Sequence, residues 1–470
     1  MDKLELDPNR LFPAEPGVRR IAQQLFAEAE TYPILSPHGH VDPRWFAANT
    51  PFENAVSLFL WPDHYVLRML YSQGIGQNRM GIPGGNLAVQ TDARAIWRLF
   101  AENFHLFRGT PSRIWFDHVF TTVFGLDQAL SPRTADLYFD HINEALAQPA
   151  FRPRALFERF RIEAIATTEG ALDPLGHHQA IRASGWPGRV ITTFRPDDVV
   201  DPDRGDFVAN LATLGELTGE NTAIWSQYLA ALARRREYFR IVGGATSTDH
   251  GHPTARTADL SAAECQSLLD RLLLGRAGAG DEELFRAQML TEMAQMACED
   301  GMTMQLHPGA WRNHNPWLFA AYGRDRGADI PTQTGYVEQL KPLLNRLGNR
   351  SDLTLILFTL DESTYSRELA PLAGHYPCLR LGPPWWFHDS PEGMMRFRRR
   401  ATETAGFYNT VGFNDDTRAF LSIPARHDVA RRVDCAFLAE LVASSRLSLA
   451  EAHEVVADLT YRLPKRAYRL

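Results

Sequence analysis

The chain has 470 residues, of which 44% are hydrophobic and 22% are charged, a composition typical of globular proteins with a large buried core. Its formal net charge is −7 and it carries no long basic run, so we do not expect nucleic acid to be a partner. The chain has no stretch of 18 consecutive apolar residues, which argues against a membrane-spanning segment.

The first predicted strand, 33–40, ends in two histidines separated by one glycine. Side chains at i and i+2 of a strand point to the same face, so His38 and His40 should project together, and Gly39 leaves room for a close approach. Two neutral imidazoles on one face suit a metal ion such as zinc. An isolated H-x-H pair is more often two polar loop residues, so a metal site requires a third ligand elsewhere in the chain.

About 120 residues separate this strand from the next, far more than one crossover helix needs. Four segments of the stretch carry apolar residues at the spacing of helices: NAVSLFLWPDHYVLRMLYSQG, DARAIWRLFAENFHLF, SRIWFDHVFTTVFG and RTADLYFDHINEALA. We therefore expect a helical subdomain, residues 46–160, inserted after the first strand. Its larger aromatic residues are expected to be core: Trp61, Trp97, Phe100, Trp115 and Phe120.

Short apolar runs that end in polar or small residues predict eight strands: 33–40, 162–170, 189–197, 239–247, 302–310, 353–362, 378–386 and 410–418. Helical patterns lie between most of them, such as 390–406, in which Ser390 is a predicted N-cap and Gly406 ends the helix. SLAE, 448–451, is a capping box. The alternation predicts the α/β class and a (β/α)8, TIM-type barrel. A doubly wound open sheet is the alternative, although no G-x-G-x-x-G follows the first strand.

The expected organisation has three parts: residues 1–45 with the first strand, the helical insertion 46–160, and residues 161–470 with the remaining barrel and C-terminal helices. In such barrels, functional residues lie at the C-terminal ends of strands. An aspartate ending the eighth strand would lie beside the two histidines, because the first and eighth strands are neighbours in a closed barrel. Three protein ligands with an open fourth position are typical of a catalytic metal site.

H-x-H on the first strand with an aspartate on the eighth resembles the amidohydrolase superfamily. Within it, collinear segments over nearly the whole chain resemble the uronate (glucuronate) isomerase family: DHYVLRML (63–70), ATTEGALDPLGHH (166–178), TFRPD (193–197), STDHG (247–251), QLHPGAWRNHN (305–315), PPWWFHDSPEGM (383–394) and DTRAFLS (416–422). The chain departs from the family pattern in having LSPHGH around the histidines, T-T-E-G after the second strand, and Asp415 where a threonine is typical.

The resemblance implies roles for individual residues. The metal ligands would be His38, His40 and Asp416. The catalytic residues would be Asp416, His64 and Tyr65. Substrate would be bound by Arg195, Arg418, Trp385, Trp386, His307 and Arg312. An ion pair of Arg195 with Asp197 or Asp198 is the alternative to its contact with substrate.

Pro62 and Asp63 mark the start of a helix whose first turn contains His64 and Tyr65. That turn lies at the positive end of the helix dipole, which suits an anionic substrate or enediolate. We therefore expect this part of the insertion to close over the barrel mouth, unless the two side chains merely pack.

Lysine usage bears on the number of metal ions. The chain has three lysines, Lys3, Lys341 and Lys465, and none lies on a predicted strand. Because binuclear members of the superfamily bridge two metals with a modified strand lysine, the resemblance implies one divalent ion, with zinc the first candidate.

The family's chemistry converts D-glucuronate to D-fructuronate, D-galacturonate to D-tagaturonate, or both, through proton transfer between C2 and C1 via an enediol. The site needs a base near C2, a polariser for the carbonyl and arginines for the carboxylate. Asp416 is the first candidate for the base and Tyr65 is the alternative. The sequence leaves open this choice, the preferred sugar and the identity of the metal.

Two other functions compete with an aldose–ketose isomerase. A metal-dependent hydrolase or deaminase of the same superfamily has no reason to keep several arginines at strand ends, and a non-catalytic sugar-acid-binding barrel would not need both H-x-H and the late aspartate. The expected partner is a small hexuronate, and a homo-oligomer is compatible with the family. Four scattered cysteines and an N-terminal stretch without a signal-peptide core predict a cytoplasmic protein.

Overall fold

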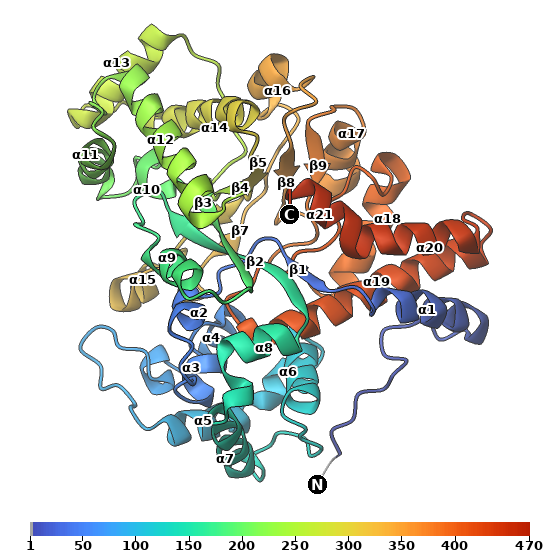
Figure 1. Ribbon diagram of the computed structural model, residues 1–470. Coiled ribbons are helices and arrows are strands. Elements are labelled where there is room, and N and C mark those ends of the chain that lie inside the picture. Colours follow the sequence, from blue (N-terminus) through green and yellow to red (C-terminus); the bar gives the residue numbers. More distant parts are fainter. Residues whose placement is uncertain (1–2) are drawn as a thin grey trace.

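The computed structural model describes residues 3–470, and its centre is a parallel sheet (Figure 1). Within those residues the sheet has seven strands: β1 (Ile34–Ser36), β2 (Ile162–Gly170), β3 (Arg189–Arg195), β4 (Ser247–His250), β5 (Thr303–Leu306), β8 (Leu355–Leu357) and β9 (Leu379–Leu381). Their order across the sheet follows their order in the chain. A doubly wound sheet reverses that order partway, so this alternative is excluded.

The two edges of the sheet approach each other through residues 409–417. Thr410 forms a parallel bridge with Leu381 of β9. Beyond the end of β1, the His40 amide donates a hydrogen bond to the Thr417 carbonyl at 3.0 Å. The chain therefore has an α/β fold with a curled parallel sheet. The predicted eighth strand, 410–418, is reduced to one bridge, because only its first residues bond to β9 and Asp416 leaves the β region with φ +33°.

The prediction of the fourth strand, 239–247, is wrong. Residues up to Gly243 complete helix α12 (Trp225–Gly243), Gly244 ends that helix with φ +68°, and β4 begins only at Ser247. The β-branched pair in FRIVGG belongs to the last turn of a long helix, whose packing overrides local β preference. The first strand is also shorter than predicted, so His38 and His40 lie just past its end.

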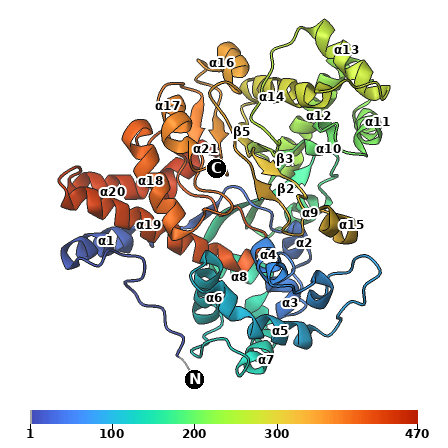
Figure 2. The same cartoon turned by 180° about the vertical axis from the view of Figure 1, so that it is seen from behind.

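Between β1 and β2 the chain forms helices α2 (Pro43–Ala48), α3 (Ala55–Phe59), α4 (His64–Ser72), α5 (Ala93–Glu102), α6 (Pro111–Thr122), α7 (Ala135–Leu146) and α8 (Pro153–Arg159). They gather at one end of the molecule in both views (Figures 1 and 2). As predicted, Trp97, Phe100, Trp115 and Phe120 are buried in the core of this part, and Trp61 packs against it half-buried.

The remaining helices cover the sheet and its far end: α1 (Pro16–Ala29), α9 (Gly176–Ala183), α10 (Asp197–Val200), α11 (Phe207–Thr218), α13 (Ala262–Leu273), α14 (Asp281–Asp300), α15 (Pro316–Tyr322), α16 (Lys341–Leu347), α17 (Ala370–Ala373), α18 (Pro391–Ala405), α19 (Ile423–Ala443), α20 (Leu449–Ala457) and α21 (Leu463–Ala467). Between α14 and α16, β6 (Ala310–Trp311) and β7 (Ile330–Pro331) form an antiparallel pair. In both ribbon views α11 and α13 lie opposite the α2–α8 group, and α1 lies beside α19 and α20.

The predicted helix starts at Ser390 and Ser448 are confirmed. The Ser390 hydroxyl accepts the Gly393 amide at 3.1 Å at the start of α18, and Ser448 and Glu451 form a reciprocal capping box at the start of α20. These caps satisfy amide donors that the first helical turn leaves without partners.

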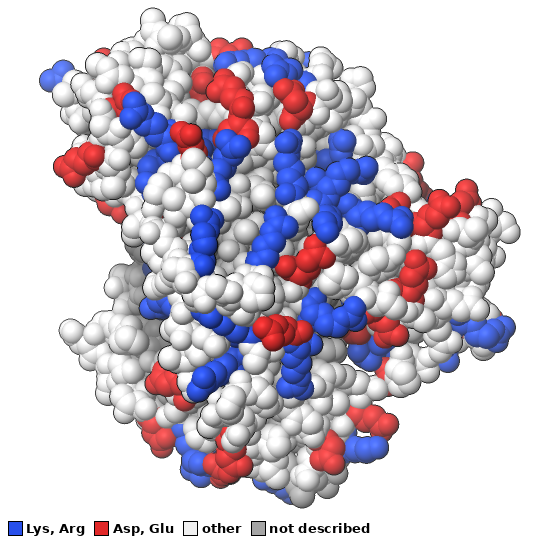
Figure 3. Space-filling view, in the orientation of Figure 1, with Lys and Arg blue, Asp and Glu red and all other residues white. Residues whose placement is uncertain are grey.

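The surface carries charge of both signs. On the face shown in Figure 3, basic side chains form a central band that acidic side chains interrupt. Among residues 3–470, no helix has the length and apolar character needed to cross a lipid bilayer.

Candidate active site

A cavity of about 370 Å³ lies at the carboxyl ends of the strands and is lined by every residue that the sequence placed in the site. These residues are His38, His40, His64, Tyr65, Arg195, His307, Arg312, Trp385, Trp386, Asp416 and Arg418. They come from the segment after β1, α4, β3, the segment after β5, and the loops after β9, so residues separated by almost 400 positions share one space.

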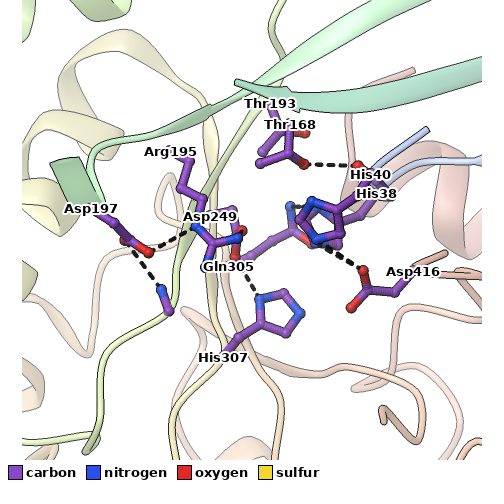
Figure 4. Close-up of polar contacts among 12 residues, drawn as sticks. His38, His40, Thr168, Thr193, Arg195, Asp197, Asp249, Gln305, His307 and Asp416 are labelled. Atoms are coloured by element: carbon purple, nitrogen blue, oxygen red, sulfur yellow. Dashed lines mark hydrogen bonds and ion pairs between the residues drawn. The ribbon is translucent and has the colours of Figure 1, made fainter. Parts of the chain in front are cut away.

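The three predicted metal ligands lie together. His38 Nε2 is 3.6 Å and His40 Nε2 is 3.3 Å from the same oxygen, Asp416 Oδ1 (Figure 4). Burial lowers the pKa of His38 to about 4, so its imidazole is neutral at pH 7. Burial alone would raise the pKa of Asp416, but the adjacent His38 and His40 hold it well below its usual range. Neutral imidazoles and an ionised carboxylate are the forms that bind a metal.

Glycine at position 39 allows the first strand to approach the segment that carries Asp416. A Cβ at Gly39 would lie 3.3 Å from the Thr417 carbonyl oxygen and 3.6 Å from Asp415 Oδ1. On its other side, the Gly39 carbonyl accepts the Thr168 hydroxyl of β2 at 2.9 Å. The glycine therefore fits between two neighbouring segments and brings the histidines within reach of Asp416.

Asp415, the residue that departs from the family pattern, is buried and has both carboxylate oxygens engaged by the protein. Its Oδ1 accepts the Ser36 hydroxyl at 3.1 Å, and its Oδ2 lies 3.0 Å from His427 Nε2. These bonds tie residue 415 to both β1 and α19. The arrangement fixes the backbone from which Asp416 projects with φ +33°.

His307 belongs to the same cluster. Its Nδ1 lies 2.7 Å from Asp249 Oδ1, while its buried Nε2 has no hydrogen-bond partner among the described residues. Ligand atoms of His307, His38 and Asp416 all lie within 4.8 Å of one another, and those of His38, His40 and Asp249 form a second such group. A free buried imidazole nitrogen beside a carboxylate fits a divalent cation that takes nitrogen and oxygen ligands.

Each predicted substrate arginine is already paired with an aspartate. Arg195 donates to Asp197 at 2.8 Å, and its Nη1 is 3.4 Å from Asp249 Oδ2. The ion pair with Asp197 therefore exists, yet Arg195 also lines the cavity. The other pairs are Arg312 with Asp329 at 2.8 Å and Arg418 with Asp325 at 3.4 Å.

Helix α4 places His64 and Tyr65 at the cavity as expected. Its N-cap, Asp63, accepts the Tyr65 amide at 2.8 Å. Burial lowers the pKa of His64 to about 4, with the nearby Arg418 acting in the same direction. Burial also raises the pKa of Tyr65 well above its ordinary value, which keeps the phenol protonated.

Several residues that support the site could not be assigned from the sequence. Asp249 is hydrogen-bonded to His307, and His427 is hydrogen-bonded to Asp415. Asp389 accepts a hydrogen bond from the Tyr65 hydroxyl at 2.6 Å. Asp249 ends a strand and Asp389 lies in the segment PPWWFHDSPEGM, but no spacing linked either residue to its partner.

The fold and the cavity define a class: α/β proteins in which a curled parallel sheet delivers histidines, carboxylates and arginines to one site beyond its carboxyl edge. A family model described as glucuronate isomerase matches residues 18–468. The chain belongs to the glucuronate isomerase family.

Individual relatives agree over their full lengths. The chain is 63% identical to a uronate isomerase of Phenylobacterium zucineum, over 99% of this chain and 97% of the relative, and 64% identical to one of Rhizorhabdus wittichii, over 99% of each. It is similar to the crystal structure of glucuronate isomerase from Caulobacter crescentus, with 58% identity, a TM-score of 0.97, and coverage of 100% of this chain and 98% of that one. A structure described as a putative metal-dependent hydrolase from Lactobacillus casei, 12% identical with a TM-score of 0.50 over 80% of this chain and 91% of that one, shares the fold alone.

Proposed function

We propose that this member of the glucuronate isomerase family interconverts an aldose and a ketose hexuronate, acting on D-glucuronate, D-galacturonate or both by proton transfer between C2 and C1 through an enediol. The observation that carries the proposal is the composition of the cavity: a His/Asp cluster shares one space with Arg195, Arg312 and Arg418. A sugar acid has a hydroxyl- and carbonyl-bearing end, which suits the His/Asp cluster, and a carboxylate end, which suits the arginines.

We propose that the sheet completes a (β/α)8 barrel in which residues 410–418 take the place of the eighth strand. The bridge from Leu381 to Thr410 and the hydrogen bond from His40 to Thr417 support closure. The division into 1–45, 46–160 and 161–470, with 46–160 as an inserted subdomain, follows from the same reading.

His38, His40 and Asp416 would hold one divalent metal ion, for which zinc suits two imidazoles and a carboxylate. When bound, such an ion supplies Lewis-acid polarisation of a substrate oxygen. The free Nε2 of His307 leaves room for this residue as a further ligand or as a donor to substrate. A single ion agrees with the absence of lysine from the strands described in residues 3–470.

The substrate carboxylate would be bound by Arg195 and Arg418, with Arg312 and His307 contributing nearby. A planar guanidinium can bind a carboxylate through two parallel hydrogen bonds. Trp385 and Trp386 line the same cavity and would exclude water from the sugar's apolar face.

Asp416 is the proposed base for C2, because it is ionised at neutral pH. Tyr65 is a poor base by comparison, since burial and the neighbouring Asp389 oppose loss of its proton. His64, neutral at pH 7, would hydrogen-bond to the reacting end of the sugar. In this scheme the C2 proton moves to the Asp416 carboxylate and returns to C1 of the enediol. A proton is also gained by O1 and lost from O2, so that the C1 aldehyde becomes a hydroxyl and C2 becomes the carbonyl.

The test is to incubate the purified protein with D-glucuronate and, separately, D-galacturonate, and to follow loss of the aldehyde. Loss with at least one sugar, abolished in Asp416→Asn, is the expected result. An unchanged aldehyde signal for both sugars would contradict the proposal. A cytoplasmic location and a homo-oligomer remain predictions, to be tested by fractionation and by light scattering.

A further inference from the structure

The hydroxyl of Tyr65 has most of its hydrogen-bonding capacity taken up by the protein. It donates to Asp389 Oδ1 at 2.6 Å and accepts the Phe387 amide at 2.9 Å. A phenol has one proton and two lone pairs. One lone pair is therefore left over, on a residue that lines the cavity.

Asp389 is itself held in one orientation. Its second oxygen, Oδ2, accepts Arg426 Nη1 at 2.8 Å. The Arg426 guanidinium stacks 3.6 Å from the Trp115 ring centroid and donates through Nε to Ser422 at 3.1 Å. Asp389 and Arg426 are both more than nine-tenths buried. A buried carboxylate with both oxygens engaged keeps its acceptor toward Tyr65, so the direction of the phenol proton is fixed.

We infer that Asp389 is a positioning residue that engages the Tyr65 proton, so that Tyr65 meets substrate as a hydrogen-bond acceptor for a hydroxyl group. The inference rests on the proposed function, because it assumes a polyhydroxy acid in the cavity. A substrate hydroxyl can donate to the remaining lone pair, whereas a carboxylate or carbonyl oxygen has no proton to give. Tyr65 would thus select a sugar hydroxyl, while the arginines take the carboxylate.

The network also reaches the backbone beside Asp416. Arg426 Nη1 lies 3.4 Å from the Asp415 carbonyl oxygen, and this guanidinium is shared with Asp389. One buried ion pair thereby supports both the phenol that would contact the sugar hydroxyl and the segment that carries the proposed base. Loss of the Asp389 charge should therefore lower turnover by a route separate from any effect on folding.

A double-mutant cycle tests this role. Tyr65→Phe, Asp389→Asn and the double variant are compared with the wild type in kcat, KM and, by calorimetry, hexuronate affinity. Each single variant should lose about tenfold or more in kcat/KM, the size expected for a hydrogen bond to a charged group. The double variant should be at most about threefold worse than the poorer single variant, because both changes break one shared interaction. Losses that multiply, or an Asp389→Asn variant close to wild type, would overturn the inference.

Asp389→Asn leaves Arg426 buried without its counter-charge, which can unfold the protein. The cycle is therefore repeated in an Arg426→Gln background, with Arg426→Gln alone as the reference. Folding of every variant is checked by circular dichroism and thermal unfolding. If Asp389→Asn couples to Arg426→Gln and not to Tyr65→Phe, Asp389 serves only the ion pair and the inference fails.

The two measurements, turnover and calorimetric affinity for hexuronate, distinguish failure of this inference from failure of the proposed function. A wild type that binds hexuronate without isomerising it contradicts the proposed function, while the calorimetric cycle still measures the coupling of Tyr65 to Asp389. A wild type that isomerises hexuronate, with additive losses in the variants, contradicts the positioning role alone. A wild type that does neither overturns both.

Discussion

At the scale of single residues, the cavity's arginines are set in place before any substrate arrives. Arg195 lies between Asp197 and Asp249, and Asp249 in turn is bonded to His307. This arrangement fixes the guanidinium in space but leaves its charge largely balanced. The affinity for a substrate carboxylate would therefore come mainly from preorganisation, since the N–H donors of the rigid guanidinium already point in fixed directions.

Replacing Arg195 by Met should raise KM and lower kcat/KM by about 30-fold or more, because cutting a desolvated charge-assisted pair costs on the order of 2–5 kcal/mol. Steady-state kinetics with the preferred hexuronate measures the loss. Arg346→Met is the matched control, since Arg346 pairs with Asp259 outside the cavity. Kinetics unchanged in Arg195→Met would remove this residue from substrate binding.

The site could be predicted from the sequence only as far as local patterns extend. The i, i+2 spacing of His38 and His40 placed two imidazoles together, and the order of strands brought Asp416 beside them. Asp389 and His427 act through partners 324 and 12 positions away, and neither lies on a pattern with a fixed period. Contacts of this kind depend on loop conformations that no residue spacing encodes.

At the scale of elements, the starts of two helices lie next to the cavity. Helix α4 begins at His64 behind its cap Asp63, and α18 begins at Pro391 behind its cap Ser390, directly after the loop with Trp385 and Asp389. Because a capped first turn holds the residues before it, the position of this loop depends on the start of α18.

Ser390→Ala should cost about 1 kcal/mol of unfolding free energy, the usual effect of losing an N-cap, and should also lower kcat/KM. Ser448→Ala is the matched control, because the Ser448 hydroxyl likewise accepts an amide of the first turn, at the start of α20, and lies outside the cavity lining. The control should lose similar stability and keep its kinetics. Denaturant unfolding and steady-state assays on both variants decide, and equal kinetic losses would show that the α18 cap has no special link to the site.

Element prediction succeeded where periodicity was long and failed where it was short. β2 lies at the predicted 162–170, and α18 lies within the predicted 390–406. The run FRIVGG was misassigned because its aromatic residue and its two β-branched residues also fit the end of the 19-residue helix α12. The segment 410–418 has strand-like composition, but its backbone turns to deliver Asp416.

At the scale of the whole molecule, a metal shared by the histidines after β1 and by Asp416 would join segments at the two edges of the curled sheet. A ligand that binds only the folded state stabilises it by RT ln(1 + [L]/Kd), about 2.7 kcal/mol at a hundred times Kd. Removal of the metal by a chelator should therefore lower Tm, and zinc should restore it.

The control for chelation is His40→Ala, which lacks one proposed ligand and should respond less to chelator and to zinc. Differential scanning calorimetry and metal analysis of the same samples provide the comparison. Equal shifts of Tm in the variant and the wild type would place the metal elsewhere.

Two buried histidines, His178 and His250, and the half-buried His118 should make the protein sensitive to acid. Burial lowers the pKa of His118 and His178 to about 4 and that of His250 to about 3, against about 6.5 in an unfolded chain. Below pH 6.5 the unfolded state therefore binds more protons, and unfolding free energy should fall by about 1.4 kcal/mol per pH unit for each such group until its folded pKa is reached. Urea unfolding at pH 7, 6 and 5 measures the slope, which should be smaller in His178→Asn; an equal slope would exclude His178.

The most direct test of the central claim is proton NMR of D-glucuronate and D-galacturonate incubated with the enzyme in D₂O. Proton transfer through an enediol predicts that the ketose appears for at least one sugar and that part of it carries solvent deuterium at C1, because a proton held on Asp416 can exchange with solvent before it returns. Aldose that stays unchanged, or ketose whose C1 carries only the hydrogen taken from C2, would contradict the account.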